Sequence, residues 1–562
     1  MHNADDAGPR ASHFVWRTSA VLLAALVLLA LGLRVASLRL VAGTIDWEGG
    51  EYARLAQNLL LGNGYIGLDL PGKNLMFPPL FPLAIAGASW LTSDLEIAAR
   101  SISVLAGALL PIPIFFLARR LYGAGVGHLA ALLVALHPLL VHFSATACSE
   151  PIFLLLLASA VCLSGRALKE GTPGSFALAG GGLGFAYLTR IEAAAFPLIV
   201  VVLALLRVRW IRTVGPGRAV AAVMCLPLAF ALVVSPYVLW LHGETGQWRL
   251  EAKSPLNIET ARRVLLEGQD INQAHYAVEP NLAEQGVWLK PAIASVREVR
   301  FSITDVIQLI KRRASVAFPF LWDTVTGKAF GTPMLISMAF LGVFASQWKN
   351  AVQPVQLLML AIVLIACLQT TLIIFENVRF LLVPLPFLLI WAAAGALHLM
   401  RWLRGTLECS DYNFLHPVGV SRGGVFLILL VSLSVAYRVA HQVYPIKKFD
   451  KSTRFVAEIG RQLSSGVETR VHLAEASTAF FYYADAEWVP LPYSTSETAL
   501  NYFDKRQVTH IALRESAIDS RPYLRNWMAN GIPSPRAELI QDASLESGER
   551  FRIYRWTAPN KM

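Results

Sequence analysis

The chain has 562 residues, of which 55% are hydrophobic and only 15% are charged, with a formal net charge of +11. Soluble domains carry about 25% charged residues, so this composition excludes an ordinary soluble protein and indicates an integral membrane protein. The basic residues stand in short groups between apolar runs, which is typical of cytoplasmic loops and argues against a nucleic-acid-binding surface. We therefore expect membrane lipids, and no nucleic acid, among its partners.

Apolar runs of about 20 residues, the length that spans a bilayer, recur along most of the chain. The first follows a cytoplasmic N-terminus at 1–17 and is longer than the apolar region of a signal peptide, so we expect a retained signal anchor. The fold class that we expect is mainly α: a multi-pass transmembrane helical bundle of about 11 spans over residues 18–445. The predicted spans are 18–40, 98–118, 126–146, 150–168, 174–189, 193–209, 219–241, 331–348, 354–374, 380–400 and 423–441.

Every second loop between these runs is basic and the remaining loops are not, with the exception of Lys311, Arg312 and Arg313 in the loop 242–330. With the N-terminus in the cytoplasm, this alternation satisfies the positive-inside rule and leaves the long loops 42–97 and 242–330 outside. We expect amphipathic helices in these loops, lying on the outer membrane face. The basic residues of the inner ends are Arg119, Arg120, Arg166, Lys169, Arg207, Arg209, Arg212, Arg218, Lys349, Arg401, Arg404 and Arg422.

The first external loop carries three acids close to the hydrocarbon edge, Asp46, Glu48 and Glu51. From Glu48 onward the apolar residues recur at helical spacing, which predicts a short amphipathic helix along the membrane face. Gly62 and Gly64 are expected to end this helix. Charge near hydrocarbon is costly, so a cluster of three acids here indicates a functional role.

Other external turns also carry acids and arginines. Glu150 lies between two predicted spans and precedes Pro151, while Arg190 and Glu192 lie together in a second turn. A third turn, 375–380, contains Glu376 and Arg379. Because the inward loops carry little besides Lys and Arg, we expect any chemistry on the outer face.

Residues 446–562 have ordinary polarity and alternate helical with strand-like patterns, which predicts a small C-terminal α/β soluble domain outside the cytoplasm. The expected helices are 451–464, 497–507 and 520–530, and the expected strands are 470–475, 488–491, 508–513 and 551–556.

Four short motifs of the first external loop carry a family resemblance. They are Asp46, then Tyr52-Ala53-Arg54-Leu55-Ala56, then Gly62-Asn63-Gly64-Tyr65, then Phe77-Pro78-Pro79-Leu80. Their order resembles that in the C-type membrane glycosyltransferases, in the bacterial branch near the protein O-mannosyltransferases and the lipid A aminoarabinose transferase.

The resemblance implies an enzyme of the bacterial cytoplasmic (inner) membrane. Such an enzyme moves a hexosyl or pentosyl group from a polyprenyl-phosphate sugar donor to an acceptor hydroxyl on a lipid, glycan or protein, with inversion. It implies an extracytoplasmic active site, with Asp46 as the catalytic base.

Sugar transfer of this kind needs a base for the acceptor proton and cationic groups for the departing phosphate. Glu48 is the alternative to Asp46, and Glu150 stands where the family has a second acid. Arg190 and Arg379 are candidate ligands of the donor phosphate, because guanidinium binds phosphate in bidentate fashion. The expected substrate-binding residues are Tyr52, Glu51, Glu192 and Glu376.

Several of these residues also have a purely structural interpretation. Glu150 suits the N-terminus of a helix, where the dipole favours an acid. Arg190 can form an internal ion pair with Glu192, Glu51 can orient its helix or pair with Arg54, Tyr52 can anchor the membrane interface, and Glu376 can pair with Arg379.

Two further questions stay open at the level of sequence. No cofactor is required, but Asp46, Glu48 and Glu150 offer hard oxygen ligands that suit a divalent metal ion. The rival function is a transporter or flippase for lipid-linked sugars, which would need ionisable residues in the middle of spans. Here such residues lie mostly at the outer ends, which favours the enzyme.

Overall fold

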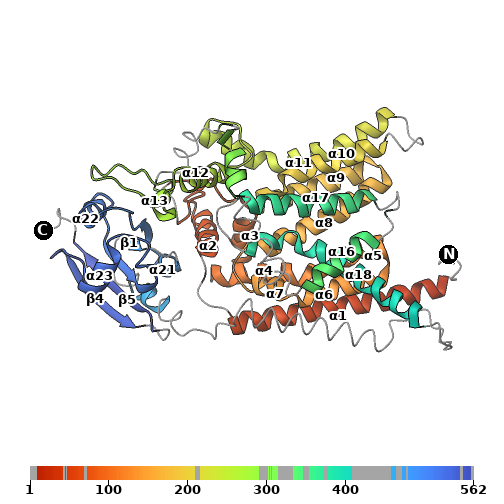
Figure 1. Ribbon diagram of the computed structural model, residues 1–562, viewed down its shortest axis with the longest axis horizontal. Helices are drawn as coiled ribbons and strands as arrows, with labels where there is room; N and C mark the ends of the chain where they lie inside the picture. The colour runs from red at the N-terminus through yellow and green to blue at the C-terminus, as the bar shows by residue number, and fades with distance from the viewer. Residues whose placement is uncertain are drawn as a thin grey trace.

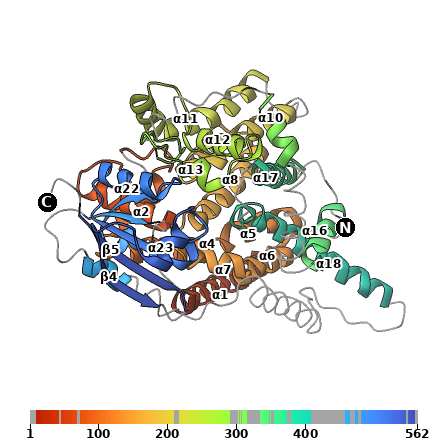
Figure 2. The same ribbon diagram turned by 60° about the vertical axis from the view of Figure 1, so that its left-hand side comes forward.

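The computed structural model describes residues 9–41, 45, 47–68, 72–208, 216–289, 302, 304–305, 307–313, 333–345, 348, 353–372, 378–407, 457–463, 471–475, 479–544 and 548–557. Figure 1 shows a bundle of long helices and, beyond one end of it, a small C-terminal module built on a β-sheet. The turned view of Figure 2 shows the module at the same end.

The bundle is formed by apolar helices that overlap the predicted spans, although the expected spans 98–118 and 126–146 each correspond to two helices. The expected span 423–441 lies outside the described residues. The helices are α1 (Pro9–Val41), α4 (Leu95–Leu109), α5 (Pro111–Tyr122), α6 (Ala124–Leu136), α7 (Pro138–Ser144), α8 (Glu150–Glu170), α9 (Pro173–Tyr187), α10 (Phe196–Val208), α11 (Pro216–Thr245), α16 (Pro333–Ala345), α17 (Gln353–Leu372) and α18 (Leu385–Leu407).

Among the described residues, five helices are long and apolar enough to cross a membrane, or six if α6 and α7 form one span. These two helices meet at a bend of 55°, so the expected single span 126–146 is divided. His137 has extended backbone angles, because the residue before a proline is disfavoured in a helix. The chain is thus a multi-pass helical membrane protein, and the count of about 11 spans stays a prediction.

Glycines let several of these helices pack at close range. A Cβ on Gly180 of α9 would clash with the backbone carbonyl of Leu226 in α11. In the same way, Gly342 of α16 lies against the backbone of Trp391 in α18. Small residues at helix contacts are the usual means of close packing within membranes, where apolar burial does not drive association.

Four short helices lie near the module end of the bundle (Figure 1). They belong to the two long loops that were expected outside. They are α2 (Trp47–Leu60), α3 (Leu80–Ala88), α12 (Lys253–Leu265) and α13 (Ile271–Tyr276).

Helix α2 is confirmed as a helix, but its surroundings differ from the expectation. Gly62 and Gly64, both with positive φ, follow its end as predicted. Its polar residues do not face water: Glu51 is 0% exposed and Arg54 is 2% exposed. These residues are enclosed because Leu68 and Asn74 of the same loop contact Glu51, and Asp485 of the C-terminal module contacts Arg54.

The C-terminal module contains a five-stranded sheet of order β2-β1-β3-β5-β4. Strand β1 pairs in parallel with β2 and β3, while β5 pairs antiparallel with β3 and β4. Of these strands, β4 has no counterpart in the prediction. The bounds are β1 (His472–Glu475), β2 (Glu487–Pro490), β3 (His510–Arg514), β4 (Ala537–Ser544) and β5 (Arg550–Trp556), with helices 457–463, α21 (Ala479–Tyr483), α22 (Ser496–Lys505) and α23 (Leu524–Asn530).

The two hydrophobic cores of the module also include residues of the external loops. Val278 and Leu289 pack into the core with Trp527, and Leu68 packs with Phe480 and Phe551 on the other side. The module is therefore joined to the bundle by shared apolar packing as well as by the chain itself.

Candidate functional site

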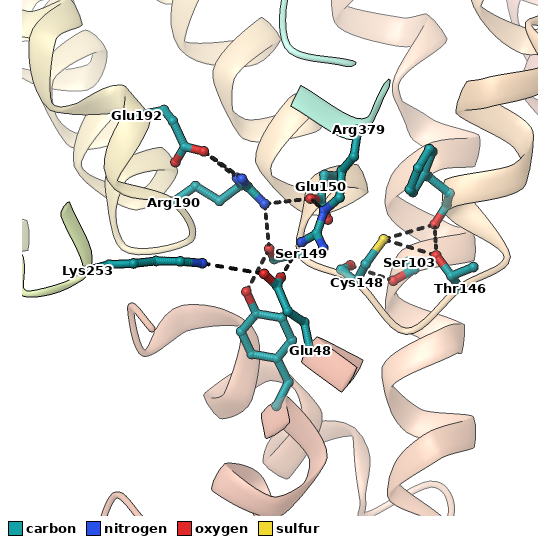
Figure 3. A network of polar contacts seen from close by, with 12 residues as sticks. Glu48, Ser103, Thr146, Cys148, Ser149, Glu150, Arg190, Glu192, Lys253 and Arg379 are labelled. Atoms are coloured by element: carbon teal, nitrogen blue, oxygen red, sulfur yellow. Dashed lines mark hydrogen bonds and ion pairs between the residues drawn. The ribbon is translucent and has the colours of Figure 1, made fainter. Parts of the chain in front are cut away.

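Five separate segments bring charged side chains together at the end of the bundle that faces the module. Figure 3 shows Glu48 from the first turn of α2, Glu150 at the start of α8, and Arg190 with Glu192 from the turn after α9. Arg379 comes from η4, a short 3-10 helix (Val378–Leu382), and Lys253 is the first residue of α12. We call these six residues the charged cluster.

Local structure explains why several of these side chains point inward. Pro151 follows Glu150 in the first turn of α8, where a missing backbone N–H costs nothing. Arg190 has extended angles, φ −151° and ψ 132°, between α9 and the 3-10 helix η2 (Ile191–Ala195). This kink turns its side chain toward the start of α8.

Arg379 is the centre of the charged cluster. Its guanidinium donates to Glu48 through Nη2 and to Glu150 through Nε. Lys253 lies on the other side of Glu48, with Nζ 3.4 Å from Oε1. Glu48 thus stands between two cations.

Arg190 extends the same network. Its Nη1 lies 2.6 Å from Glu150 Oε1, and its Nη2 lies 2.6 Å from Glu192 Oε1. The expected Arg190–Glu192 pair is present, but it is part of a larger network and not an isolated ion pair. One oxygen of Glu150, Oε2, is buried without a hydrogen-bond partner.

The charged cluster contains three acids and three bases and is largely shielded from water. Glu150 is 2% exposed, and the side chains of Arg190 and Arg379 are 11% and 13% exposed. Buried charges are tolerated when they are paired and hydrogen-bonded. Removing one member would therefore leave an opposite charge without compensation.

The pKa values follow from burial and from this pairing. Burial by itself would raise the pKa of Glu48, but the charges of Arg379 and Lys253 outweigh it and hold that pKa far below its usual value. Burial opposes the charge of Arg379 as well, yet Glu150 and Glu48 raise the pKa of its guanidinium. Glu48 is therefore an ionised and weakly basic carboxylate in this state.

Aromatic rings form one wall of the charged cluster. Tyr52 packs edge-on against Phe77 and Phe81, with ring centroids 5.0 Å apart in each pair. Its hydroxyl lies 3.1 Å from Ser149 Oγ, and Lys253 Nζ lies 4.7 Å from the centre of the Phe77 ring. Tyr52 is only 2% exposed, so it supports this wall and is not an anchor at the membrane surface.

Glu51 points away from the charged cluster. It accepts hydrogen bonds from the backbone N–H of Leu68 and from the side chain of Asn74. A Cβ on Gly67 would collide with the Glu51 carboxylate, which would have to shift from this place. Arg54 forms an ion pair with Asp485 of the C-terminal module. These contacts replace the expected Glu51–Arg54 pair.

Two expected site residues, Asp46 and Glu376, lie outside the described residues. Two residues of the site were not singled out from the sequence, Lys253 and Ser149. Lys253 is a basic residue in a loop that was expected outside, and the positive-inside rule predicts few basic residues there. This departure from the rule is the only feature of the sequence that could have pointed to Lys253. Ser149 is adjacent to Glu150 and could be found only from its contacts.

The fit of a divalent metal ion can be tested on the two described carboxylates. Within the described ranges, no group of three or more His, Cys, Asp or Glu side chains is arranged to hold a metal. Glu48 and Glu150 both bind the Arg379 guanidinium. A cation at this place would have to displace that group, so the described donor set does not fit a metal.

Comparison with protein families gives one match. Residues 77–240 match the family model described as dolichyl-phosphate-mannose-protein mannosyltransferase. This segment includes Glu150 and Arg190 and covers less than a third of the chain. No curated protein sequence matches the chain.

Comparison with solved structures shows a shared fold over most of the chain. AglB, the oligosaccharyltransferase from Archaeoglobus fulgidus, solved with an inhibitory peptide and a dolichol-phosphate, has a TM-score of 0.58 at 11% identity, covering 89% of this chain and 69% of its own. ArnT from Cupriavidus metallidurans, solved bound to undecaprenyl phosphate, has a TM-score of 0.53 at 12% identity. The match covers 96% of this chain and 98% of the ArnT chain. The Archaeoglobus oligosaccharyltransferase in complex with Zn and sulfate has a TM-score of 0.59 at 12% identity, covering 94% and 72%.

Proposed function

We propose that this chain is a membrane glycosyltransferase of the C-type superfamily, which the match at 77–240 and the shared fold support. The protein transfers a sugar from a polyprenyl-phosphate donor to an acceptor hydroxyl on the outer face of the cytoplasmic membrane. The observation that carries this proposal is the charged cluster, in which Arg190, Arg379 and Lys253 converge next to two buried carboxylates.

The three cations are suited to the donor phosphate. A phosphate oxygen carries the same charge as a carboxylate oxygen and binds guanidinium in the same bidentate manner. Glu48 lies between Arg379 and Lys253. The donor phosphate would compete with Glu48 for these two cations, and Glu150 would keep Arg190 and Arg379 in position.

While Arg379 and Lys253 lie beside it, Glu48 is poorly suited to act as the base. A general base works best when its pKa lies near the operating pH. The cations hold the pKa of Glu48 well below its usual value, so Glu48 is a poor proton acceptor while they are in place. We keep Asp46 in the role that the family resemblance implies, and Glu48 competes with the donor phosphate for Arg379 and Lys253.

The reaction balances with these groups. Asp46 accepts the proton of the acceptor hydroxyl, and the oxygen attacks the anomeric carbon from the face opposite the phosphate. The bond between the anomeric carbon and the phosphate oxygen breaks, and polyprenyl phosphate leaves with the electron pair. Arg190 and Arg379 stabilise the charge that develops on the leaving phosphate, which is the larger part of such catalysis. The configuration at the anomeric carbon inverts.

The test is an Asp46→Asn variant of the full chain in membranes supplied with labelled polyprenyl-phosphate sugars. We expect transfer to fall by about 100-fold or more, because one general base contributes about 10²–10⁴-fold. Asp519→Asn is the matched control, since Asp519 is an exposed residue of the C-terminal module paired with Arg525. Undiminished transfer by Asp46→Asn would show that Asp46 is not the base. If the wild type transferred no sugar from any of the labelled donors, the proposed function would be wrong.

A further inference from the structure

The C-terminal module is in direct contact with α2, the helix that carries Glu48. Helix α21 packs on α2, where a Cβ added to Gly50 would lie at an ordinary contact distance, 3.5 Å, from the Cβ of Tyr482. A second contact joins the turn after α21 to the middle of α2, where Asp485 pairs with the buried Arg54.

Tyr483 of α21 makes the contact that bears on the site. Its hydroxyl accepts a hydrogen bond of 2.9 Å from the backbone N–H of Ile45 and donates one of 2.8 Å to Glu96 Oε2. Both partners belong to the bundle part of the chain. Ile45 is 1% exposed and stands directly before Asp46 in the sequence.

Glu96 connects Tyr483 to the segment that leads to Glu150. Glu96 Oε1 accepts from Arg100 Nε at 2.9 Å, and Arg100 Nη1 donates to the carbonyl of Ala145 at 3.1 Å. Ala145 stands in the segment that leads to Glu150. One hydrogen-bonded path therefore links the backbone on the N-terminal side of α2 with the backbone on the N-terminal side of α8.

We propose that Tyr483 is a positioning residue for sugar transfer: by holding the Ile45 backbone, the C-terminal module sets the place of the acidic segment relative to the phosphate-binding cations. This inference rests on the proposed function and deepens it. It assigns the module a part in catalysis, in addition to any part in acceptor access.

The physical reason is that sugar transfer tolerates little displacement between the reacting groups. A displacement of about 1 Å between reacting groups can cost about 100-fold in rate. Without the Tyr483 hydroxyl, the Ile45 N–H loses its buried acceptor, and only the packing of the Ile45 side chain in the core still holds this residue. Arg190 and Arg379 are held by ion pairs with Glu150, which Tyr483 reaches only through the longer path by Glu96 and Arg100, so we expect their arrangement to change less than that of the Ile45 backbone.

The test is Tyr483→Phe in the full chain, with donor kinetics and undecaprenyl phosphate binding measured together. The ring, which also lies under the guanidinium of Arg461, is kept, and only the hydroxyl is lost. We expect kcat to fall about 10- to 100-fold, with the donor KM and undecaprenyl phosphate affinity unchanged.

The matched control is Tyr523→Phe. It removes another buried tyrosine hydroxyl of the same module, one that donates to the Pro492 carbonyl at 2.9 Å, and we expect wild-type kcat. A wild-type kcat in Tyr483→Phe, or an equal loss in both variants, would overturn the positioning role. A wild type that transfers no sugar would instead count against the proposed function.

A double variant separates positioning from general damage. If Tyr483 acts through Asp46, adding Tyr483→Phe to Asp46→Asn should leave the residual rate within about twofold, because effects of coupled residues do not add. A full further loss in the double variant would show that the two residues act independently and would contradict the proposal.

Discussion

The carboxylates of the external loop illustrate how the surroundings of a residue decide its role. Glu48 and Glu51 are one helical turn apart in α2, and both are buried. Glu48 meets Arg379 and Lys253, whereas Glu51 meets the backbone N–H of Leu68. The same chemical group therefore serves the charged cluster in one case and the folding of the adjacent loop in the other.

Glu48→Gln tests the competition between this carboxylate and the donor phosphate. We expect the affinity for undecaprenyl phosphate to rise about 3- to 10-fold, because a charged acceptor that occupies Arg379 and Lys253 is replaced by a neutral one. Titration calorimetry in detergent would measure it. Glu244→Gln is the control, since Glu244 pairs with Lys73, away from the charged cluster. Weaker binding by Glu48→Gln would mean that Glu48 assists phosphate binding.

At the scale of elements, hydropathy predicted where helices form but not where they break. The apolar run 126–146 contains Pro138, and the structure divides it into α6 and α7. Strand β4 was missed because most of its residues are exposed and lack the alternation of a half-buried strand. Both errors arise where local sequence is compatible with more than one arrangement.

Close helix packing gives a prediction of stability for α9. Gly180→Ala should lower the stability by about 1–3 kcal/mol, the usual cost of overpacking, because the added methyl group meets the carbonyl of Leu226. Gly181→Ala is the matched control in the same helix, because a Cβ there meets nothing within 4 Å. Thermal unfolding of both variants in detergent measures the difference. Equal stability of the two would show that α9 and α11 do not pack this closely.

At the scale of the whole molecule, α1 runs the length of the bundle and delivers the first external loop to the end where the C-terminal module lies (Figure 1). The module then encloses α2 between itself and the bundle. This arrangement explains how segments as distant as Ile45 and Tyr483 come into hydrogen-bond contact. It also requires the module and the charged cluster to lie on one side of the membrane.

Cysteine labelling tests the orientation that we propose. Asp519→Cys in the module and Arg166→Cys near the end of α8 both place the new thiol at an exposed position, since the native side chains are 78% and 61% exposed. We expect a membrane-impermeant maleimide to label Asp519→Cys in intact spheroplasts and Arg166→Cys only after permeabilisation, against the wild type as background. Labelling in the reverse order would place the site in the cytoplasm.

The sequence by itself determined the membrane class, the helices, the mixed C-terminal module and the set of polar turns from which the site is built. These follow from local composition and periodicity, which do not depend on distant contacts. The tertiary structure decided which residues meet: that Arg379 joins Glu48 to Glu150, that Lys253 belongs to the same cluster, and that Tyr483 binds the backbone beside the first acid. Such pairings arise between residues as much as 438 positions apart, and only the packing of helices and module brings them within hydrogen-bond distance.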